Sequence, residues 1–337
     1  MHRYLIRRVL QALVVLLLVS MLGFSVLHLA PGGPAAIYAM TPTMSAEDLE
    51  RLTRQLGLDR PVPEQYVRWA GGVLTGNWGR SYRDGRLVRE VVVDRIPATL
   101  VLMVSAFTVA VGLGLFTGIV SAVRQYSLFD HLLTFGSMVA LSIPTFWLGL
   151  MGIYVFAVLL RVLPPGNMGT IGADFAVGDL LKHLVLPAAT LGVVMVATWS
   201  RYTRASMLEV IREDYMRTAQ AKGVAAGALI LKHALRNALI PLITLAGLQL
   251  PLVFSGALVT ETVFTWPGMG RLFVDSIGYR DYPVLMGLLM LTAVLVVAGN
   301  LIADLVYAAV DPRVRLSGRR PRCSRASSVI APRWRAQ

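Results

Sequence analysis

The side chains that could do chemistry in this 337-residue sequence are concentrated in one polar segment, residues 201–236. Within it, the run from Asp214 to Gly223 offers carboxylate, phenol, guanidinium, hydroxyl and ammonium groups. No catalytic motif accompanies them, because the sequence lacks a G-x-x-x-x-G-K-[ST] phosphate loop, an H-E-x-x-H helix and a G-x-S-x-G turn. The one cysteine, Cys323, excludes an intramolecular disulfide and a multi-cysteine zinc site. The chemistry of this segment is therefore recognition of another macromolecule, not catalysis.

Ionisable groups are nearly absent from the long apolar stretches around this segment. His28 and Asp304 lie near the ends of two such stretches, where we interpret each as an interfacial residue. Ion-coupled transporters and proton pumps usually carry ionisable groups at membrane depth. An ion-coupled transporter or channel, and a membrane scaffold without transport, stay open as alternatives. If material crosses a membrane through this chain, its energy source lies elsewhere, and we expect that driver to attach at 201–236.

The elements that must position this segment are membrane helices. The sequence is 55% hydrophobic and only 15% charged, whereas a soluble domain is about 25% charged. About 20 mostly apolar residues span a bilayer as a helix. Six stretches without Asp, Glu, Lys or Arg reach or approach that length: 9–30, 96–123, 132–160, 184–200, 237–260 and 282–303. We expect the fourth to extend past Arg201, and Pro144 and Pro187 to bend the third and fourth. The predicted fold class is an all-α membrane protein with six transmembrane helices.

The distribution of charge predicts the orientation of these helices. Of the 32 Lys and Arg residues, 19 fall on the side that holds both termini and segment 201–236, and nine of the other 13 lie in one loop of about 65 residues. Long loops contribute little to the positive-inside bias, so we expect both termini to be cytoplasmic. Six acidic residues lie on the same side as these 19 basic residues, which leaves +13 there. This equals the net charge of the whole chain, so we expect the excess charge to be cytoplasmic. It indicates membrane orientation and not a nucleic-acid partner.

Four regions follow. Residues 1–30 form the cytoplasmic start and first membrane helix, and 31–95 an outer helical subdomain in which Ser45 caps a helix that Gly57 ends. Two more outer helices are expected, from near Pro63 and over 87–94. Residues 96–312 form the membrane core, whose loop 201–236 reads as helices over 203–213, 214–223 and 225–237. Residues 313–337 read as a disordered basic tail that contacts membrane lipid.

The run 214–241, DYMRTAQAKGVAAGALILKHALRNALIP, resembles the cytoplasmic signature loop of permease subunits of bacterial ABC importers, in the dipeptide/oligopeptide/nickel branch. Four further stretches resemble the same branch, of which 261–272 and 280–283 together form one. They are 3–32, 55–69 with 76–81, 261–272 (ETVFTWPGMGRL), 280–283 (RDYP) and 311–316 (DPRVRL). The resemblance covers about residues 3–316.

This resemblance implies a type I ABC importer permease fold and a transport function without enzyme activity in this chain. It implies four kinds of partner: a second homologous permease, two P-loop ATPases that bind ATP and Mg, an extracytoplasmic binding protein, and membrane lipid. No cofactor is expected in this chain. The implied location is the bacterial inner membrane, and the implied cargo is di- or oligopeptides, with nickel or glutathione as alternatives.

The resemblance also implies that the short helix 214–223 is the coupling helix that an ATPase grips. The residues it assigns to that contact are Asp214, Tyr215, Arg217, Thr218, Ala219, Ala221, Lys222, Gly223, His233, Arg236 and Asn237. The general importer loop reads E-A-A-x-x-x-G, then I-x-L-P. Here, Arg217 replaces its Glu and Arg236 its later Pro. These departures leave open whether an ATPase recognises this loop by its side chains or mainly by its shape.

Overall fold

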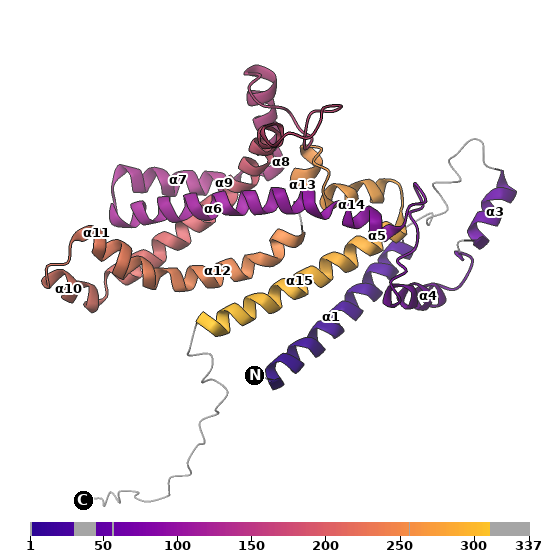
Figure 1. Cartoon of the computed structure of the whole chain (residues 1–337), viewed down its shortest axis with the longest axis horizontal. Helices are drawn as coiled ribbons and strands as arrows, with labels where there is room; N and C mark the ends of the chain where they lie inside the picture. The colour runs from indigo at the N-terminus through magenta and orange to yellow at the C-terminus, as the bar shows by residue number, and fades with distance from the viewer. Residues whose placement is uncertain (1, 30–44, 56, 256, 311–337) are drawn as a thin grey trace, which may run out of the picture.

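The computed structural model describes residues 2–29, 45–55, 57–255 and 257–310 (Figure 1). Within these ranges the chain is helical, and its only β-type pairing is an isolated bridge between Arg80 and Leu87. The predicted tail 313–337, with Cys323, lies outside the described residues, as does the side chain of Asp304. The all-α fold class is confirmed.

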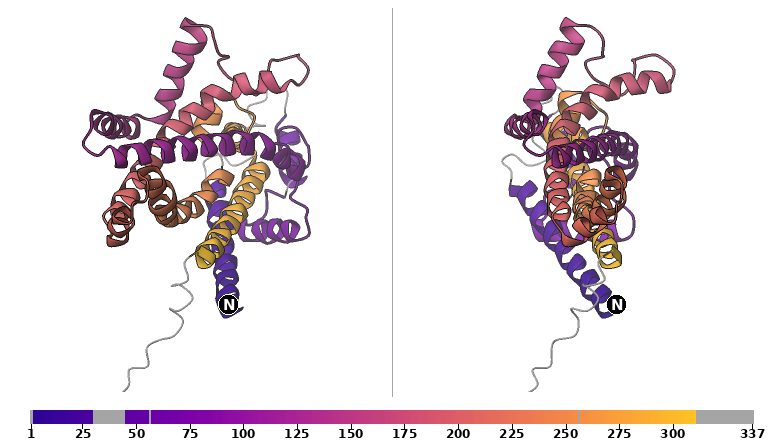
Figure 2. Two further views of the ribbon diagram at one scale, coloured as in Figure 1. Left: turned by 60° about the vertical axis from the view of Figure 1, so that its left-hand side comes forward. Right: turned by 90° about the vertical axis from the view of Figure 1, so that its left-hand side faces the viewer.

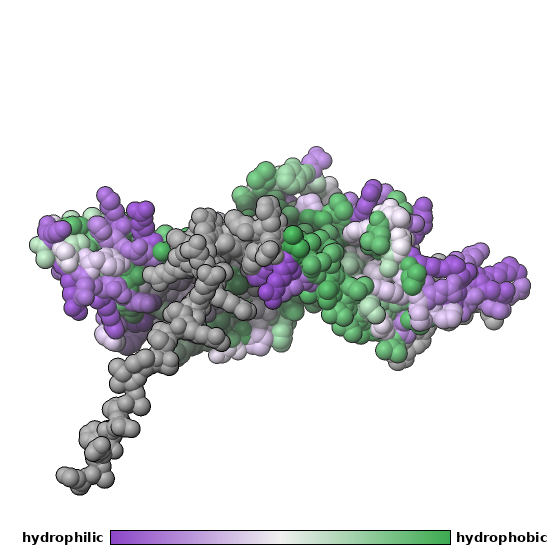
Figure 3. Space-filling view, turned by 90° about the horizontal axis from the view of Figure 1, so that it is seen from below, coloured by the Kyte–Doolittle hydropathy of each residue, from purple (hydrophilic) through white to green (hydrophobic). Residues whose placement is uncertain are grey.

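Five helical segments are long and apolar enough to span a bilayer: Ile6–Leu29, Val88–Val123, Val177–Ile211, Ala226–Gln249 and Tyr282–Ala303. They correspond, in whole or in part, to helices α1 (His2–Leu29), α6 (Ile96–Val123), α9 (Val177–Ile211), α12 (Leu235–Ser255) and α15 (Tyr282–Val310). As expected, α9 continues past Arg201. In the face shown in Figure 3, hydrophobic residues lie between two hydrophilic ends. The chain is a multi-pass membrane protein.

The third predicted span is not one straight helix. Residues 132–160 divide into α7 (Leu128–Ser142), α8 (Thr145–Gly152) and the π-helix η1 (Ile153–Leu159). The two arms are bent by 101°, so a sixth span exists only if this pair crosses as one unit. A proline disfavours the helical conformation of the residue before it, and Ile143 accordingly has φ −88° and ψ 127°. Pro187, by contrast, stays inside α9.

Helices α6 and α9 pack side by side over much of their length (Figure 1). The sequence places glycines at 112, 114 and 118 of α6, a stripe of small residues suited to close helix packing, and this stripe makes the approach possible. A Cβ at Gly114 would lie 2.3 Å from Trp199 Cβ, and one at Gly118 would lie 2.5 Å from Thr203 Cβ and 2.7 Å from the Ser200 carbonyl oxygen. Small residues let membrane helices approach this closely.

A methyl group at Gly118 is therefore expected to push α9 away from α6. Gly118→Ala should lower stability by about 1–3 kcal/mol, the usual cost of overpacking. The control is Gly112→Ala on the same helix, where an added Cβ meets nothing within 4 Å. The thermal unfolding midpoint of the purified chain should fall for Gly118→Ala only, and equal midpoints would contradict this packing.

The segment predicted to lie outside the membrane, called the outer subdomain below, contains α3 (Ala46–Gln55), α4 (Val62–Leu74) and α5 (Val88–Val93). The predicted N-cap is confirmed, because the Asp48 N–H donates to Ser45 Oγ at 3.1 Å. Gly57 has φ +68°, as its predicted place at a helix end requires. Helix α5 carries the buried residues of this subdomain. Its Val88 and Val92 are fully buried and pack in one cluster with Val284 and Leu288 of α15.

Two buried carboxylates hold the outer ends of the membrane helices together. Glu261, in α13 (Leu258–Val263), accepts from Thr99 Oγ1 of α6 at 2.9 Å. Its second oxygen accepts from the first backbone N–H groups of α14 (Met269–Gly278), those of Gly270 at 2.7 Å and Arg271 at 3.1 Å. Asp281 accepts from Ser81 Oγ at 2.5 Å, which joins two outer segments that are 200 residues apart. The sequence stretches 76–81, 261–272 and 280–283 thus form one outer layer.

Candidate functional site

The predicted contact segment is a projection at one end of the molecule, at the far left of Figure 1. Helix α9 ends at Ile211, α10 (Asp214–Ala221) follows, and α11 (Ala226–Ala228) leads back toward the membrane helices. The predicted helices 203–213 and 214–223 are confirmed to within two residues. The predicted helix 225–237 is confirmed as one continuous helical segment from Ala226, in which the π-helix η2 (Leu229–Ala234) lies between α11 and α12. Nothing in the sequence explains that π-helical turn.

One apolar side chain anchors α10. Met216 is 4% exposed and packs with Met207 of α9, Ala234 of η2, Ala238 of α12 and Ala122 of α6. Sequence reasoning missed Met216, although it is the one large aliphatic residue in 214–223. The anchor joins α10 to three membrane helices as one packed unit.

The other predicted residues form the exposed side of the projection. Asp214 and Arg217 face solvent, with side chains 95% and 77% exposed and their charged groups 3.5 Å apart. The remaining exposed members are Tyr215, Thr218, Ala221, Lys222, Gly223, Arg236 and Asn237, while Ala219 and His233 are half-buried. Such an exposed charged pair contributes little to folding. The surface is therefore free to be used in recognition.

Tyr215, His233 and Asn237 are brought together on one side of this surface. The Asn237 amide donates to Tyr215 Oη at 2.9 Å and to the His233 carbonyl oxygen at 3.1 Å. This bridge connects α10 to the start of α12. Arg217 and Lys222 take no part in this bridge and are exposed.

Gly223 ends α10 in a complete Schellman cap. Its N–H donates to the Gln220 carbonyl oxygen at 3.0 Å, and the Val224 N–H donates to that of Ala219 at 3.3 Å. Its φ is +80°, while an added Cβ would meet nothing within 4 Å. The requirement for glycine is therefore conformational and not steric.

A buried ion pair fixes the base of the projection. Arg204 of α9 donates through Nε and Nη2 to the two oxygens of Asp130, each at 2.7 Å. The Asp130 side chain is 3% exposed and also accepts from Ser121 Oγ and from the Tyr126 N–H. In the sequence, Asp130 is only one of the six acidic residues on the predicted inner side. The pair holds the 124–127 turn and α7 against α9.

Among the described residues, no group of three or more His, Cys, Asp or Glu side chains could hold a metal ion. The projection combines an apolar anchor, a rigid cap and an exposed polar surface. This arrangement suits docking against another protein and transmission of its movement to α6, α9 and α12.

Comparison with known proteins agrees with this geometry. Residues 114–316 match the family described as binding-protein-dependent transport system inner membrane component, and residues 1–103 match the N-terminal family of the same membrane component. The chain is 44% identical over 315 residues to the oligopeptide transport system permease protein AppB of Bacillus subtilis (strain 168), covering 93% of this chain and 99% of that protein.

Two further relatives are similar over the same length. A putative peptide permease protein of Brucella suis is 42% identical over 320 residues, which cover 94% of this chain and 100% of the relative. The glutathione transport system permease protein GsiC of Escherichia coli (strain K12) is 40% identical over 315 residues, 94% of this chain and 99% of the relative. The chain therefore belongs to the family of binding-protein-dependent transport system inner membrane components, the permeases of ABC importers.

Proposed function

We propose that this chain is a transmembrane subunit of an ATP-driven importer and forms part of the translocation path for di- and oligopeptides that a binding protein delivers. The observation that carries the proposal is α10, an exposed and capped helix anchored through Met216 to three membrane helices. The family supports the importer class, and the peptide permeases among the relatives support a peptide cargo.

The proposed assembly needs the four kinds of partner that the resemblance implies. A second homologous permease completes the path, two P-loop ATPases bind ATP and Mg below it, and the binding protein docks above it. Membrane lipid surrounds the helices and contacts the tail 313–337. The eleven residues assigned above to the ATPase contact keep that role as part of this proposal.

The proposed mechanism uses the packing under α10. When the ATPases close on ATP, they carry α10 with them, and the contacts of Met216 and the Tyr215–Asn237 bridge pass that movement to α9 and α12. The ATPases thus bias an equilibrium between outward-facing and inward-facing helix arrangements. Hydrolysis of ATP returns the path to its inward-facing state.

The proposed location is the bacterial inner membrane, with both termini in the cytoplasm and the 31–95 subdomain outside. The bias of Lys and Arg to the inner side supports this orientation. The division into 1–30, 31–95, 96–312 and 313–337 belongs to the same proposal.

Uptake by the reconstituted importer tests the proposal. Proteoliposomes that contain this chain, its second permease and both ATPases should accumulate a radiolabelled dipeptide only with ATP and the binding protein, and a protonophore should not reduce uptake. Uptake that survives removal of the ATPases and stops with the protonophore would instead show an ion-coupled transporter. Competition by unlabelled glutathione or nickel ions distinguishes the two alternative cargoes, of which the relative GsiC favours glutathione.

A further inference from the structure

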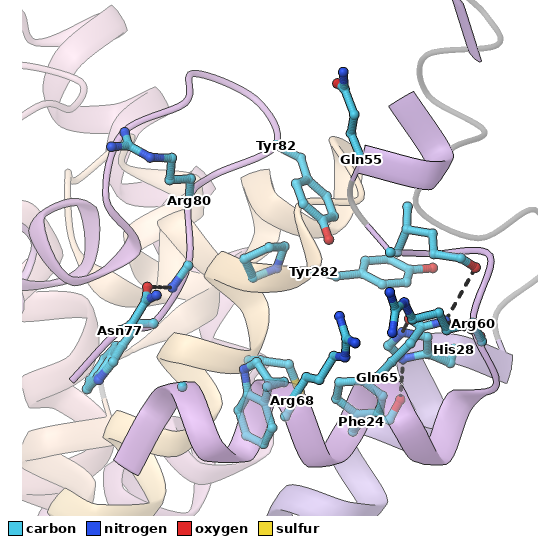
Figure 4. Close-up of a pocket in the computed structure, with 18 of the residues that line it drawn as sticks. Phe24, His28, Gln55, Arg60, Gln65, Arg68, Asn77, Arg80, Tyr82 and Tyr282 are labelled. Carbon is cyan, nitrogen blue, oxygen red and sulfur yellow. Dashed lines mark hydrogen bonds between the residues drawn. The ribbon is translucent and has the colours of Figure 1, made fainter. Parts of the chain in front are cut away.

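A cavity of about 610 Å³ lies where the outer subdomain meets the ends of α1 and α15 (Figure 4). Helix α4 forms one wall, the 77–82 segment another, and Phe24, His28 and Tyr282 come from the two membrane helices. Helix α4 and helix α10 lie on opposite sides of the molecule in Figure 1 and stay apart in the left view of Figure 2, so this cavity is separate from α10.

The lining of this cavity is basic. It includes Arg54, Arg60, Arg68 and Arg80, and no Asp or Glu among the described lining residues. Arg60 and Arg68 both form an ion pair with the same oxygen of Glu64, at 2.5 and 3.3 Å. Glu64 itself does not line the cavity. Two guanidinium groups sharing one carboxylate leave an excess of positive charge, which favours an anionic ligand.

The floor of the cavity is aromatic. Phe24 stacks on His28 with ring centroids 4.0 Å apart and lies 5.7 Å from the Trp69 ring, while Tyr282 meets His28 edge-on at 5.6 Å. In Figure 4, Arg68 extends from α4 into the space below Tyr82 and Tyr282. The ligand thus meets guanidinium donors on one side and flat apolar surface on the other.

The depth of the cavity indicates which anion it takes. Phe24 and His28 lie in the last two turns of the span Ile6–Leu29, and Tyr282 begins the span Tyr282–Ala303. Tryptophan and tyrosine rings gather at this level, where lipid headgroups meet the hydrocarbon. Arginine forms bidentate hydrogen bonds with phosphate. A phospholipid carries an anionic phosphate at this depth, joined to apolar acyl chains, and so fits both the arginines and the aromatic rings.

We propose that this cavity binds the headgroup of an anionic phospholipid from the leaflet on the side of the outer subdomain. Arg60 and Arg68 donate to its phosphate, and the aromatic floor contacts the glycerol and the first methylene groups. The arginines can turn from Glu64 to the phosphate at small cost, because the Glu64 side chain is 45% exposed and such surface pairs contribute little. The bound lipid fixes the subdomain to the membrane surface.

The test measures the thermal unfolding midpoint of the full chain in detergent during titration with dioctanoyl phosphatidylglycerol. We expect saturable stabilisation that neither dioctanoyl phosphatidylcholine nor inorganic phosphate reproduces. Arg60→Gln with Arg68→Gln should weaken apparent binding at least about tenfold, since hydrogen bonds to charged groups are lost. The matched control is Arg51→Gln on α3, which also breaks an i,i+4 pair, to Glu47, but does not line the cavity.

Three results would overturn the proposal. They are equal lipid binding by the double variant and the wild type, equal stabilisation by inorganic phosphate alone, and stabilisation by an acidic decapeptide but not by the lipid. The last of these would assign the cavity to a protein partner. If the double variant does not fold, Arg68→Gln alone removes only the longer of the two pairs to Glu64 and should still weaken lipid binding.

Discussion

Replacement of Gly223 by valine is expected to abolish uptake while the protein still inserts into the membrane. Gly223 has φ +80°, a conformation that a β-branched residue rarely adopts, and a non-glycine residue held in the left-handed region costs about 1–3 kcal/mol. Relaxing that strain breaks the two hydrogen bonds of the cap and shifts the end of an eight-residue helix. Since α10 is proposed to dock in the ATPases, the displaced end should also reduce their co-purification.

Gly227→Val is the matched control for this experiment. Gly227 lies four residues further along the same projection, is exposed, and has no positive φ. An added Cβ meets nothing within 4 Å at either position, so the pair isolates the backbone conformation. Radiolabelled peptide uptake and recovery of the ATPases on this chain should be lost for Gly223→Val and kept for Gly227→Val. If both variants retain uptake and ATPase binding, α10 does not have the proposed role.

Replacement of Glu261 by alanine is expected to give a large loss of stability. The side chain is fully buried, and its removal leaves the Gly270 N–H, the Arg271 N–H and the Thr99 hydroxyl without their acceptor. Each buried donor left unsatisfied costs about 1–3 kcal/mol, so the three donors together cost about 3–9 kcal/mol. The thermal unfolding midpoint of the purified chain measures this loss.

Glu261→Gln should lose much less stability than Glu261→Ala. The glutamine Oε1 can accept from the two backbone N–H groups, and its Nε2 can donate to Thr99 Oγ1. That hydroxyl already accepts from the Met269 N–H at 2.8 Å and has a second lone pair. Asp275→Ala, at a 43% exposed carboxylate on α14, should leave the midpoint nearly unchanged. A destabilised Asp275→Ala variant together with an unaffected Glu261→Ala variant would disprove this account of the outer layer.

Local features of the fold could be predicted from the sequence because they depend on neighbouring residues. The end of α10 is set by glycine at 223, the start of α3 by Ser45 with Asp48, and the close α6–α9 contact by Gly114 and Gly118. Each of these signals lies within a few residues of its effect.

Features that depend on distant contacts could not be predicted in this way. Met216 is the one large aliphatic residue in the eight residues of α10, so no periodicity identifies it as an anchor. The sequence gives no sign that three acidic residues are buried and hydrogen-bonded, because their partners lie 74 to 200 residues away. The pairs are Asp130 with Arg204, Glu261 with Thr99, and Asp281 with Ser81.

The two prolines show the same limit. Pro144 breaks its span by 101°, while Pro187 remains within a continuous helix. Their immediate sequence does not distinguish these outcomes, because neighbouring helices decide whether the carbonyl group that a proline leaves free finds a partner.

A cross-linking measurement tests most directly whether α10 is the contact with the ATPases. In a Cys323→Ser background, a photoactivatable maleimide is attached to Thr218→Cys, at an exposed position on α10, or to Thr75→Cys, at the exposed end of α4. In the assembled importer, Thr218→Cys should cross-link to an ATPase subunit and Thr75→Cys should not. An intact complex in which Thr218→Cys yields no ATPase cross-link, or in which Thr75→Cys yields one, would contradict the proposed function of this chain.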